Sequence, residues 1–331
     1  VVGYGSTTKG DLTGNISNVK GEDLATVPVV NFQDALQGRM AGVFVQSSSG
    51  KLGEGVKIRV RGTTSISGGN DPLYVIDGVP VTTGGALGYY NPMADINFND
   101  IESLEVLKDA SASAIYGARG ANGVVIITTK TGSKGKTKFN VGIQRGISSP
   151  TRTRDFLNSA QYIELMREGA YNNDLQIYDI DPINNPDDYD GSDLQFVESR
   201  LDRYSGYADW RTGEIDTDWQ DQAFNDDAGT FSVNFSASGG DEKTRFFLSG
   251  AYDQQTGILI RNDFERISAR LNLDHSVSEK FLIGANFGLS RTENNRLSND
   301  NAFNNPIQLV AMAPITPIRD QEGVLYDRPT T

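Results

Sequence analysis

The chain has 331 residues, of which 37% are hydrophobic and 22% charged, a balance typical of a folded protein rather than a disordered one. It contains no cysteine, which excludes a disulfide framework, a thiol nucleophile and a thiolate zinc site. The net charge of −13 excludes a general nucleic-acid binder, and no apolar run reaches the roughly 18 residues of a membrane-spanning helix.

The first ten residues form a Gly- and Thr-rich N-terminal arm that starts with two valines. This composition predicts an extended segment that could pair as an added strand with another protein. The alternative is the frayed end of a truncated chain. No secretory signal precedes Val1, so an exported protein would be expected to start upstream.

Two elements are predicted between residues 31 and 62. NFQDALQGRM at 31–40 has helical spacing with Asn31 as its cap, and a strand is expected at 43–45. Residues 56–62 alternate apolar and basic side chains, which predicts a half-buried strand with Lys57, Arg59 and Arg61 on one face. This basic stripe either forms ion pairs on a solvated surface or meets an anion or a water-filled lumen.

The segment from Asp71 to Lys130 has the pattern of a small α+β domain. Asp77 and Gly78 form a two-residue turn signal between short apolar strands. A short helix is expected from Asp109, its N-cap, to Gly117. The β-branched run at 124–127 predicts a strand covered on both faces, and no phosphate-binding loop or catalytic group stands in the segment.

These segments carry a family resemblance. LQGRMAGVFVQ at 36–46, KIRVRG at 57–62, PLYVIDGVPV at 72–81 and DIESLEVLKDASASAIYGARGANGVVIITTKTG at 100–132 resemble the plug domain of SusC/RagA-type TonB-dependent outer-membrane transporters. The resemblance implies a plug domain over residues 11–132 and places TonB-contacting residues in the arm, at Val1, Val2, Gly3, Tyr4 and Gly5. It also implies that the structural signature of the plug comprises Arg59, Arg61, Gly62, Asp77, Gly78, Lys108, Asp109, Tyr116, Gly117, Asn122 and Gly123.

Downstream of residue 138, five segments alternate apolar and polar residues for about ten residues each. The apolar positions are Phe139, Val141 and Ile143; Phe231, Val233, Phe235 and Ala237; Phe246, Leu248, Gly250 and Tyr252; Ile267, Ala269, Leu271 and Leu273; and Phe281, Ile283, Ala285, Phe287 and Leu289. The opposite parity is polar, as at Arg266, Ser268, Arg270 and Asn272. Such strands are typical of a transmembrane β-barrel, although a soluble sandwich can look similar locally.

The connections favour the barrel. Residues 239–243 and 276–280 are tight polar turns, whereas the links at 149–229, at 253–265 and from 291 onward are long, as expected for periplasmic turns and extracellular loops. Five strands cannot close a barrel, so the chain is expected to be a piece of a longer protein. The predicted fold class is an α+β plug domain followed, over residues 133–331, by antiparallel strands of an incomplete transmembrane β-barrel. The resemblance implies about 22 strands in the full protein.

The long loop at 149–229 is strongly acidic, because residues 171–230 hold 16 Asp or Glu against 3 Arg. One helix is predicted, from Ser159 to Tyr171, with Asn158 or Ser159 as its cap. The acidic remainder lacks the ligand spacing of an EF-hand, which favours a solvated loop over a calcium site. Four aromatic residues either stack on sugar rings or pack within the loop: Tyr204, Tyr207, Trp210 and Trp219.

Enzyme activity, cofactors and metals are not expected, since the lone His275 lies on the apolar face of a strand and no pair of carboxylates is aligned for catalysis. The resemblance instead implies import of a large nutrient, a glycan (oligosaccharide) or a peptide, across the outer membrane of a Gram-negative, Bacteroidota-like cell. It further implies TonB as the partner that displaces the plug and a SusD-like surface lipoprotein that captures substrate. The alternatives are a siderophore or other TonB-dependent receptor, and a non-transporting plug-and-barrel component of an outer-membrane complex.

Overall fold

A computed structural model describes residues 16–25, 36–47, 52, 56–62, 69–81, 92–109, 113–177, 191–295 and 306–325. The chain divides into two units. The plug–wall unit comprises residues 1–148, 227–257 and 261–296, and the loop unit comprises residues 149–226, 258–260 and 297–331.

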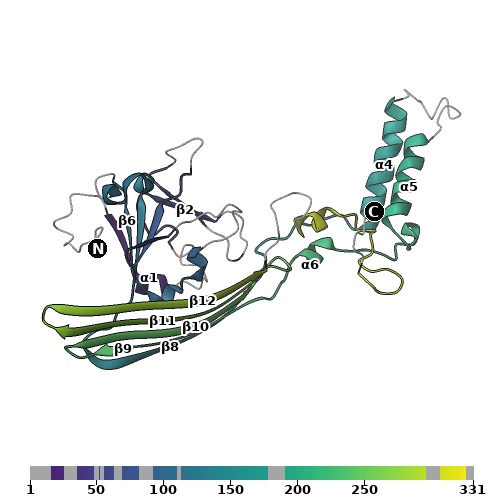
Figure 1. Ribbon diagram of the computed structural model, residues 1–331. Coiled ribbons are helices and arrows are strands. Elements are labelled where there is room, and N and C mark those ends of the chain that lie inside the picture. Colours follow the sequence, from purple (N-terminus) through teal and green to yellow (C-terminus); the bar gives the residue numbers. More distant parts are fainter. Residues whose placement is uncertain are drawn as a thin grey trace. The chain divides into compact units, whose positions relative to one another are not determined.

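A five-stranded mixed sheet, the plug sheet, forms the centre of the plug (Figure 1). Its strands, in spatial order, are β1 (Ile16–Lys20), β6 (Ile101–Leu107), β7 (Val124–Thr129), β4 (Leu73–Ile76) and β5 (Val79–Val81). Strands β4 and β7 are parallel, and the other neighbours in the sheet are antiparallel. The predicted Asp77-Gly78 turn is confirmed: both residues have positive φ, 48° and 86°, as a tight turn between β4 and β5 requires.

The plug core lies on both faces of β7, because Val124, Val125 and Ile127 are fully buried, as the β-branched run predicted. Helix α1 (Gly21–Ala25) follows β1 closely, and a Cβ at Gly21 would lie 1.8 Å from the Ile101 carbonyl oxygen. The plug also contains the antiparallel pair of β2 (Val43–Ser47) and β3 (Val56–Val60), and the short helices η2 (Pro92–Asp95), η3 (Phe98–Asp100) and η4 (Ala114–Gly120).

Two predicted helices of the plug differ from the structure. Of the helix expected at 31–40, residues 36–39 form a turn that brings Leu36 into the core, and residues 31–35 lie outside the described residues. The helix expected to end at Gly117 includes a 3₁₀ segment that runs on to Gly120, with Gly117 as a kink at φ 61° and ψ −147°. A glycine can adopt this conformation inside the segment, so it need not mark the end.

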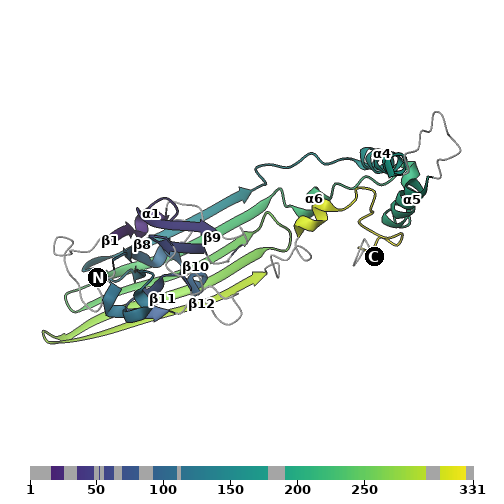
Figure 2. The ribbon, with the colours of Figure 1, turned by 90° about the horizontal axis from the view of Figure 1, so that it is seen from above.

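A second sheet, the wall sheet, consists of five long antiparallel strands in sequence order, which lie side by side in Figure 2. They are β8 (Gly135–Ser148), β9 (Ala228–Gly240), β10 (Thr244–Thr256), β11 (Asp263–Ser278) and β12 (Phe281–Asn295). The two tight turns were predicted correctly. The prediction of a long link at 253–265 is wrong. Strands β10 and β11 remain paired through most of this range, so only residues 257–262 connect them.

The wall sheet is inverted relative to a sheet in a water-soluble protein. Its apolar face is open, with Phe139 69% exposed and Leu289 76% exposed, whereas on its polar face Arg266 and Asn272 are at most 1% exposed and contact the plug. A soluble sandwich would bury the apolar face and expose the polar one. The wall sheet therefore suits hydrocarbon on one side and a polar interior on the other.

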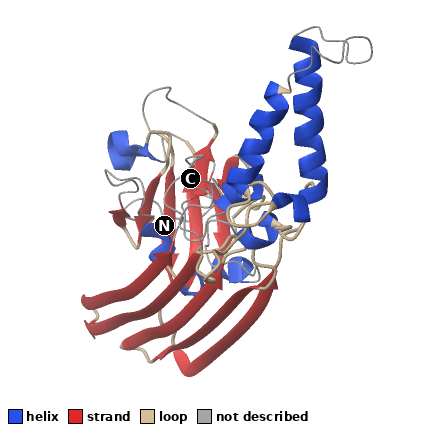
Figure 3. Ribbon diagram, turned by 90° about the vertical axis from the view of Figure 1, so that its right-hand side faces the viewer, coloured by secondary structure: helices blue, strands red, loops and turns tan. Residues whose placement is uncertain are grey.

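The loop unit is built on two helices, α4 (Ser159–Ile177) and α5 (Ser192–Tyr204), which lie beside each other (Figure 3). Asn158 caps α4 as predicted, since its Oδ1 accepts from Gln161 N at 2.9 Å and Gln161 Oε1 accepts from Asn158 N at 3.1 Å. The prediction of a single helix is wrong, because α5, α6 (Trp219–Ala223) and the 3₁₀ turn η6 (Trp210–Thr212) also form here.

A small core holds the loop unit together. Leu201 of α5, Trp210 and Ile315 are buried against one another, and Tyr162 of α4 packs on them. Ile315 lies just beyond the last 3₁₀ segment, η7 (Pro306–Ala311), so two parts of the chain about 100 residues apart share this core.

Candidate functional site

Strand β11 turns a row of polar side chains toward the plug, and this row is the candidate functional site. Arg266 is fully buried in it. Its Nη2 and Nε contact Asp253 Oδ2 on β10 at 2.7 and 3.1 Å, and its Nη1 donates to the Ile96 carbonyl of the plug at 2.9 Å. Ser232 on β9 donates to the other Asp253 oxygen at 2.6 Å. A charged pair that belongs to the wall thus holds the plug by its backbone.

Arg270, further along β11, faces two carboxylates of the plug. Its Nη1 lies 3.6 Å from Asp77 Oδ2 and its Nε lies 3.5 Å from Asp100 Oδ2. Asp77 is fixed in turn by Thr129, whose backbone N and Oγ1 both donate to it at 2.8 Å. The arginine distances are those of loose ion pairs rather than of short hydrogen bonds, so plug and wall can part here without breaking a bidentate clamp.

Further contacts extend the row in both directions. Asn272 Nδ2 donates to Thr129 Oγ1 at 3.0 Å and to the Lys130 carbonyl at 2.7 Å. On β12, Thr292 Oγ1 donates to Asp95 Oδ1 at 2.7 Å. Strands β11 and β12 therefore bind the plug through polar groups, whose hydrogen bonds water can replace when the two surfaces separate.

A polar cavity of about 270 Å³ lies beside this row, and its lining includes Glu22, Asn97, Asp100, Asn234 and Ser249. Burial raises the pKa of Asp100, although the Ser249 hydroxyl and the cations of Arg270, Lys130 and Arg266 act in the opposite direction. Among the described residues, Asp100 Oδ1 and Ser249 Oγ are buried without a hydrogen bond of normal geometry. A polar cavity with such atoms in its lining is suited to hold water between plug and wall.

The charged residues of the predicted plug signature form contacts inside the plug. Arg59 pairs with Asp71, and Arg61 pairs with Asp109. For these two arginines the structure therefore favours the ion-paired surface over an anion site. Lys108 donates to the Ala41 carbonyl, and Asn122 Nδ2 donates to the Gly69 carbonyl at 2.8 Å.

The remaining signature residues shape the backbone. Gly62, Gly78, Gly117 and Gly123 have positive φ values of 101°, 86°, 61° and 90°, a region in which a side chain is strained. Tyr116 is buried in a small plug cluster with Val75, Leu107, Val124 and Ile126. The expected TonB-contacting residues Val1, Val2, Gly3, Tyr4 and Gly5 lie outside the described residues.

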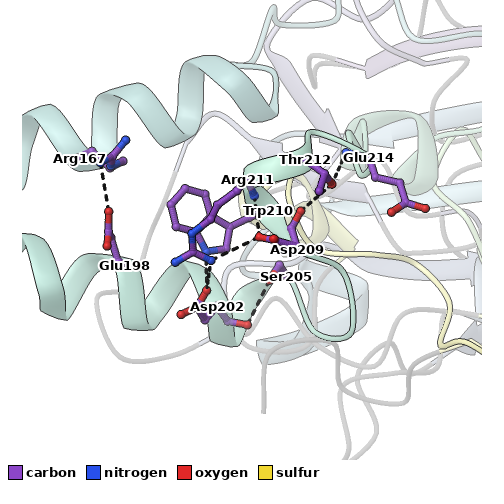
Figure 4. Close-up of polar contacts among 9 residues, drawn as sticks. All are labelled: Arg167, Glu198, Asp202, Ser205, Asp209, Trp210, Arg211, Thr212 and Glu214. Carbon is purple, nitrogen blue, oxygen red and sulfur yellow. Dashed lines mark hydrogen bonds and ion pairs between the residues drawn. The ribbon is translucent and has the colours of Figure 1, made fainter.

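The two tryptophans predicted to contact substrate or to pack are buried in the loop unit. Trp210 Nε1 donates to Asp202 Oδ1 at 2.6 Å, while the guanidinium of Arg211 stacks 4.2 Å from the Trp210 ring centre and donates to the same carboxylate (Figure 4). Trp219 Nε1 donates to the Ala313 carbonyl at 3.0 Å. These contacts favour packing over sugar stacking for both rings. Tyr204 is half-buried, and Tyr207 is 43% exposed.

Across the described ranges, no three His, Cys, Asp or Glu side chains are grouped to hold a metal ion. None of the helices in these ranges combines the length and hydropathy needed to cross a membrane. The single histidine, His275, contacts the Thr244 hydroxyl through Nδ1 at 2.8 Å, across from it on β10.

Sequence reasoning placed Arg266, Arg270 and Asn272 on a polar strand face but assigned them no partner. Their contacts with the plug lie at least 142 residues earlier in the chain, at Ile96, Asp77, Asp100, Thr129 and Lys130. The feature of the sequence that could have indicated these contacts is the presence of two arginines on the lumen-facing side of one strand. Charged side chains in such a position need counter-charges, which the plug supplies to Arg270 through Asp77 and Asp100, whereas β10 supplies Asp253 to Arg266.

Comparison with known proteins agrees with this architecture. Residues 8–124 match the family model of the TonB-dependent receptor plug domain. TonB-dependent receptor SusC of Bacteroides thetaiotaomicron is 37% identical over 87% of this chain and 26% of its own length. TonB-dependent receptor P26 of Formosa agariphila is 34% identical over 98% of this chain and 29% of its own. The solved RagAB peptide transporter superposes with a TM-score of 0.75 at 28% identity, covering 95% of this chain and 35% of that one.

A plug domain held against the polar face of antiparallel barrel strands defines a TonB-dependent receptor of the outer membrane. Within that class, the chain belongs to the SusC/RagA type. This confirms the predicted fold class, with an incomplete barrel, and the predicted location in the outer membrane. The chain spans about a quarter to a third of the length of these relatives.

Proposed function

We propose that the protein imports a large nutrient across the outer membrane in a TonB-dependent manner. The observation that supports this is the polar attachment of the plug to β11 and β12, through Arg266, Arg270, Asn272 and Thr292. A permanent structural core would be apolar, whereas these contacts can be exchanged for water. Such a plug blocks the barrel at rest and can move when force is applied.

The N-terminal arm, residues 1–10, is the proposed point of attachment for TonB by strand addition. Residues 11–132 are the proposed plug, and residues 133–331 the proposed first part of the barrel, with an extracellular loop at 149–229. A SusD-like surface lipoprotein is the proposed partner that captures substrate outside the cell. No catalytic step is proposed, because the family consists of transporters and receptors.

The proposed substrate is a glycan or a peptide, since TonB-dependent receptor SusC and the RagAB peptide transporter are both among the similar proteins. Siderophore uptake is less well supported. The ferric enterobactin receptor PfeA of Pseudomonas aeruginosa is 16% identical with a TM-score of 0.52, which shows a shared fold alone. A non-transporting plug-and-barrel component of an outer-membrane complex remains the second alternative.

Deletion of residues 1–10 from the intact receptor tests the proposal. Uptake of labelled peptide and of labelled oligosaccharide should be lost, because no strand remains for TonB to pull. The amount of receptor in the outer membrane and its binding of the same probes should stay unchanged. Uptake that persists after the deletion would contradict TonB-driven import through this arm. An intact receptor that binds these probes and transports none would favour the non-transporting alternative.

A further inference from the structure

The loop unit contains two adjoining cavities. One, of about 380 Å³, is lined in part by Phe156, Leu157 and Trp219, and the other, of about 650 Å³, by Met166 and Phe196. Three residues line both cavities: Tyr162, Ala311 and Met312. The two cavities therefore adjoin along these three residues, and we call the pair the loop groove.

The walls of the loop groove are fixed by hydrogen bonds that need no ligand. Ser159 N donates to Asp216 Oδ1 at 2.8 Å at the start of α4. Thr217 N donates to the Pro314 carbonyl at 2.8 Å, and Trp219 Nε1 donates to the Ala313 carbonyl at 3.0 Å. The groove joins segments from both ends of the loop unit, so its shape is preformed, as is usual for ligand sites.

The two ends of the loop groove carry opposite charges. Asp216 and Asp218 line the smaller cavity, and both residues are exposed. Each uses its Oδ1 atom to accept from backbone N–H groups at a helix start. An acidic end of this kind attracts an ammonium group.

Arg200 and Arg203 line the larger cavity at the other end. Arg200 is held in place by the Tyr204 hydroxyl at 2.5 Å and stacks 5.8 Å from the Phe196 ring centre. Within the described part of the chain, neither arginine is paired with a carboxylate. A guanidinium positioned in this way is suited to bind a carboxylate from a ligand.

We propose that the loop groove binds a short peptide with free termini. Its amino end would meet Asp216 and Asp218, its carboxylate would meet Arg200 and Arg203, and its apolar side chains would lie over Tyr162 and Met312. This inference rests on the proposed function and names peptide rather than glycan as the substrate. A neutral sugar would use neither charged end, and the two tryptophans among the predicted sugar-stacking rings, Trp210 and Trp219, are only 6% and 5% exposed.

Calorimetry on the purified intact receptor tests this inference. The probes are alanine–leucine peptides of about three to eight residues with free termini, their N-acetylated and C-amidated forms, and maltoheptaose as a neutral glycan. We expect the free peptide to bind, and each cap to weaken binding about tenfold or more because one charge contact is lost. Maltoheptaose should not compete with the peptide.

Charge-removing variants of the receptor show which end of the loop groove recognises which terminus of the peptide. In D216N/D218N, acetylation should no longer weaken binding, and in R200Q/R203Q, amidation should no longer do so, as in a double-mutant cycle. Asparagine keeps the oxygen that caps each helix, so folding should be preserved. The matched controls are D221N and R152Q, which remove one charge each from exposed positions outside the groove lining. Both should bind the free peptide as the unaltered receptor does.

Three outcomes would overturn the inference. The caps could have no effect on the unaltered receptor, their effects could persist in the groove variants, or maltoheptaose could displace the peptide. Failure of import is distinguishable from these. A receptor that binds peptide with the predicted dependence on both termini but does not transport it would contradict the proposed function and support the loop groove.

Discussion

At the scale of single residues, the buried pair of Arg266 and Asp253 should be the most sensitive to loss of one partner, because the two side chains are only 0% and 1% exposed. We expect R266M to destabilise the protein by about 3–5 kcal/mol, because Asp253 would stay buried without its counter-charge. The double variant D253L/R266M should recover much of this loss, since it removes both charges. Urea unfolding of the intact receptor in detergent would measure the free energies.

Arg291 on β12 provides the matched control for that prediction. It pairs with Glu293, and the two side chains are 78% and 58% exposed. An exposed pair contributes about 0–1 kcal/mol, so R291M should change the unfolding free energy by no more than that. Equal effects of R266M and R291M would show that Arg266 is solvated in the working protein and does not hold the plug.

Trp210 and Trp219 should respond differently to acid. Hydrogen bonds from Arg211 and Trp210 lower the pKa of Asp202 below its ordinary value of 3.8. The Asp202 carboxylate therefore stabilises the folded loop unit above pH 3.8, and this contribution is lost as the pH falls through the lowered pKa. The Trp219 indole donates to a carbonyl, which does not titrate in this range.

Fluorine NMR of the 5-fluorotryptophan-labelled receptor would detect the difference, with W210F and W219F assigning the two signals. The Trp210 signal should shift as the pH is lowered below 3.8, and the Trp219 signal should not. A D202N variant should hold the Trp210 signal constant over the same range. Parallel shifts of both signals would instead indicate acid unfolding of the whole loop unit.

At the scale of elements, β1 is the edge strand of the plug sheet that tension on the N-terminus reaches first. It lies at the edge of the sheet, pairs with β6 alone, and directly follows the N-terminal segment. The polar row of β11 and β12 holds residues 77, 95, 96, 100, 129 and 130, none of which belongs to β1 or α1. Tension on the N-terminus should therefore release β1 and α1 before the plug moves as a whole.

A reversible cross-link between β1 and β6 tests this order. Asn18 and Glu105 are directly opposite each other and hydrogen-bonded at 3.2 Å, and antiparallel partners have the spacing that a disulfide needs. The oxidised N18C/E105C receptor should lose uptake, and reduction should restore it. The control pair I76C/V79C closes the β4–β5 turn and should leave uptake intact. Undiminished uptake by oxidised N18C/E105C would show that β1 stays in place during transport.

How far the elements could be predicted depended on whether their pattern is local. The alternation at 231–237 and 267–273 and the β-branched run at 124–127 predicted strands correctly, because the side-chain period is set within each segment. Helix α5 was not predicted, although Val197, Leu201 and Tyr204 have helical spacing. The many charged residues around these positions are typical of a solvated loop. The contacts of β11 with the plug join distant segments, and no local pattern in one sequence encodes such pairing.

At the scale of the molecule, the open apolar face of the wall sheet is the property that a membrane must cover. Along β8, Phe139, Val141, Ile143 and Ile147 are each about two-thirds or more exposed, at 69%, 67%, 73% and 69%. In water such a surface would drive aggregation, whereas in a bilayer it is solvated by lipid tails. The inverted sheet thus sets the environment in which the plug and its polar row can work.

A lysine scan along this face tests its depth in the bilayer. The cost of a charge on the lipid face is about 2–4 kcal/mol at the midplane and about 0–1 kcal/mol near the interfaces. Val141 and Ile143 lie near the middle of β8, so V141K and I143K should destabilise the folded receptor more than F139K and I147K. Q144K, on the opposite face of the same strand, should be tolerated because it meets the polar interior. Urea titration of the receptor refolded in lipid vesicles would give the profile, and equal costs at all four positions would mean that this face does not cross the hydrocarbon layer.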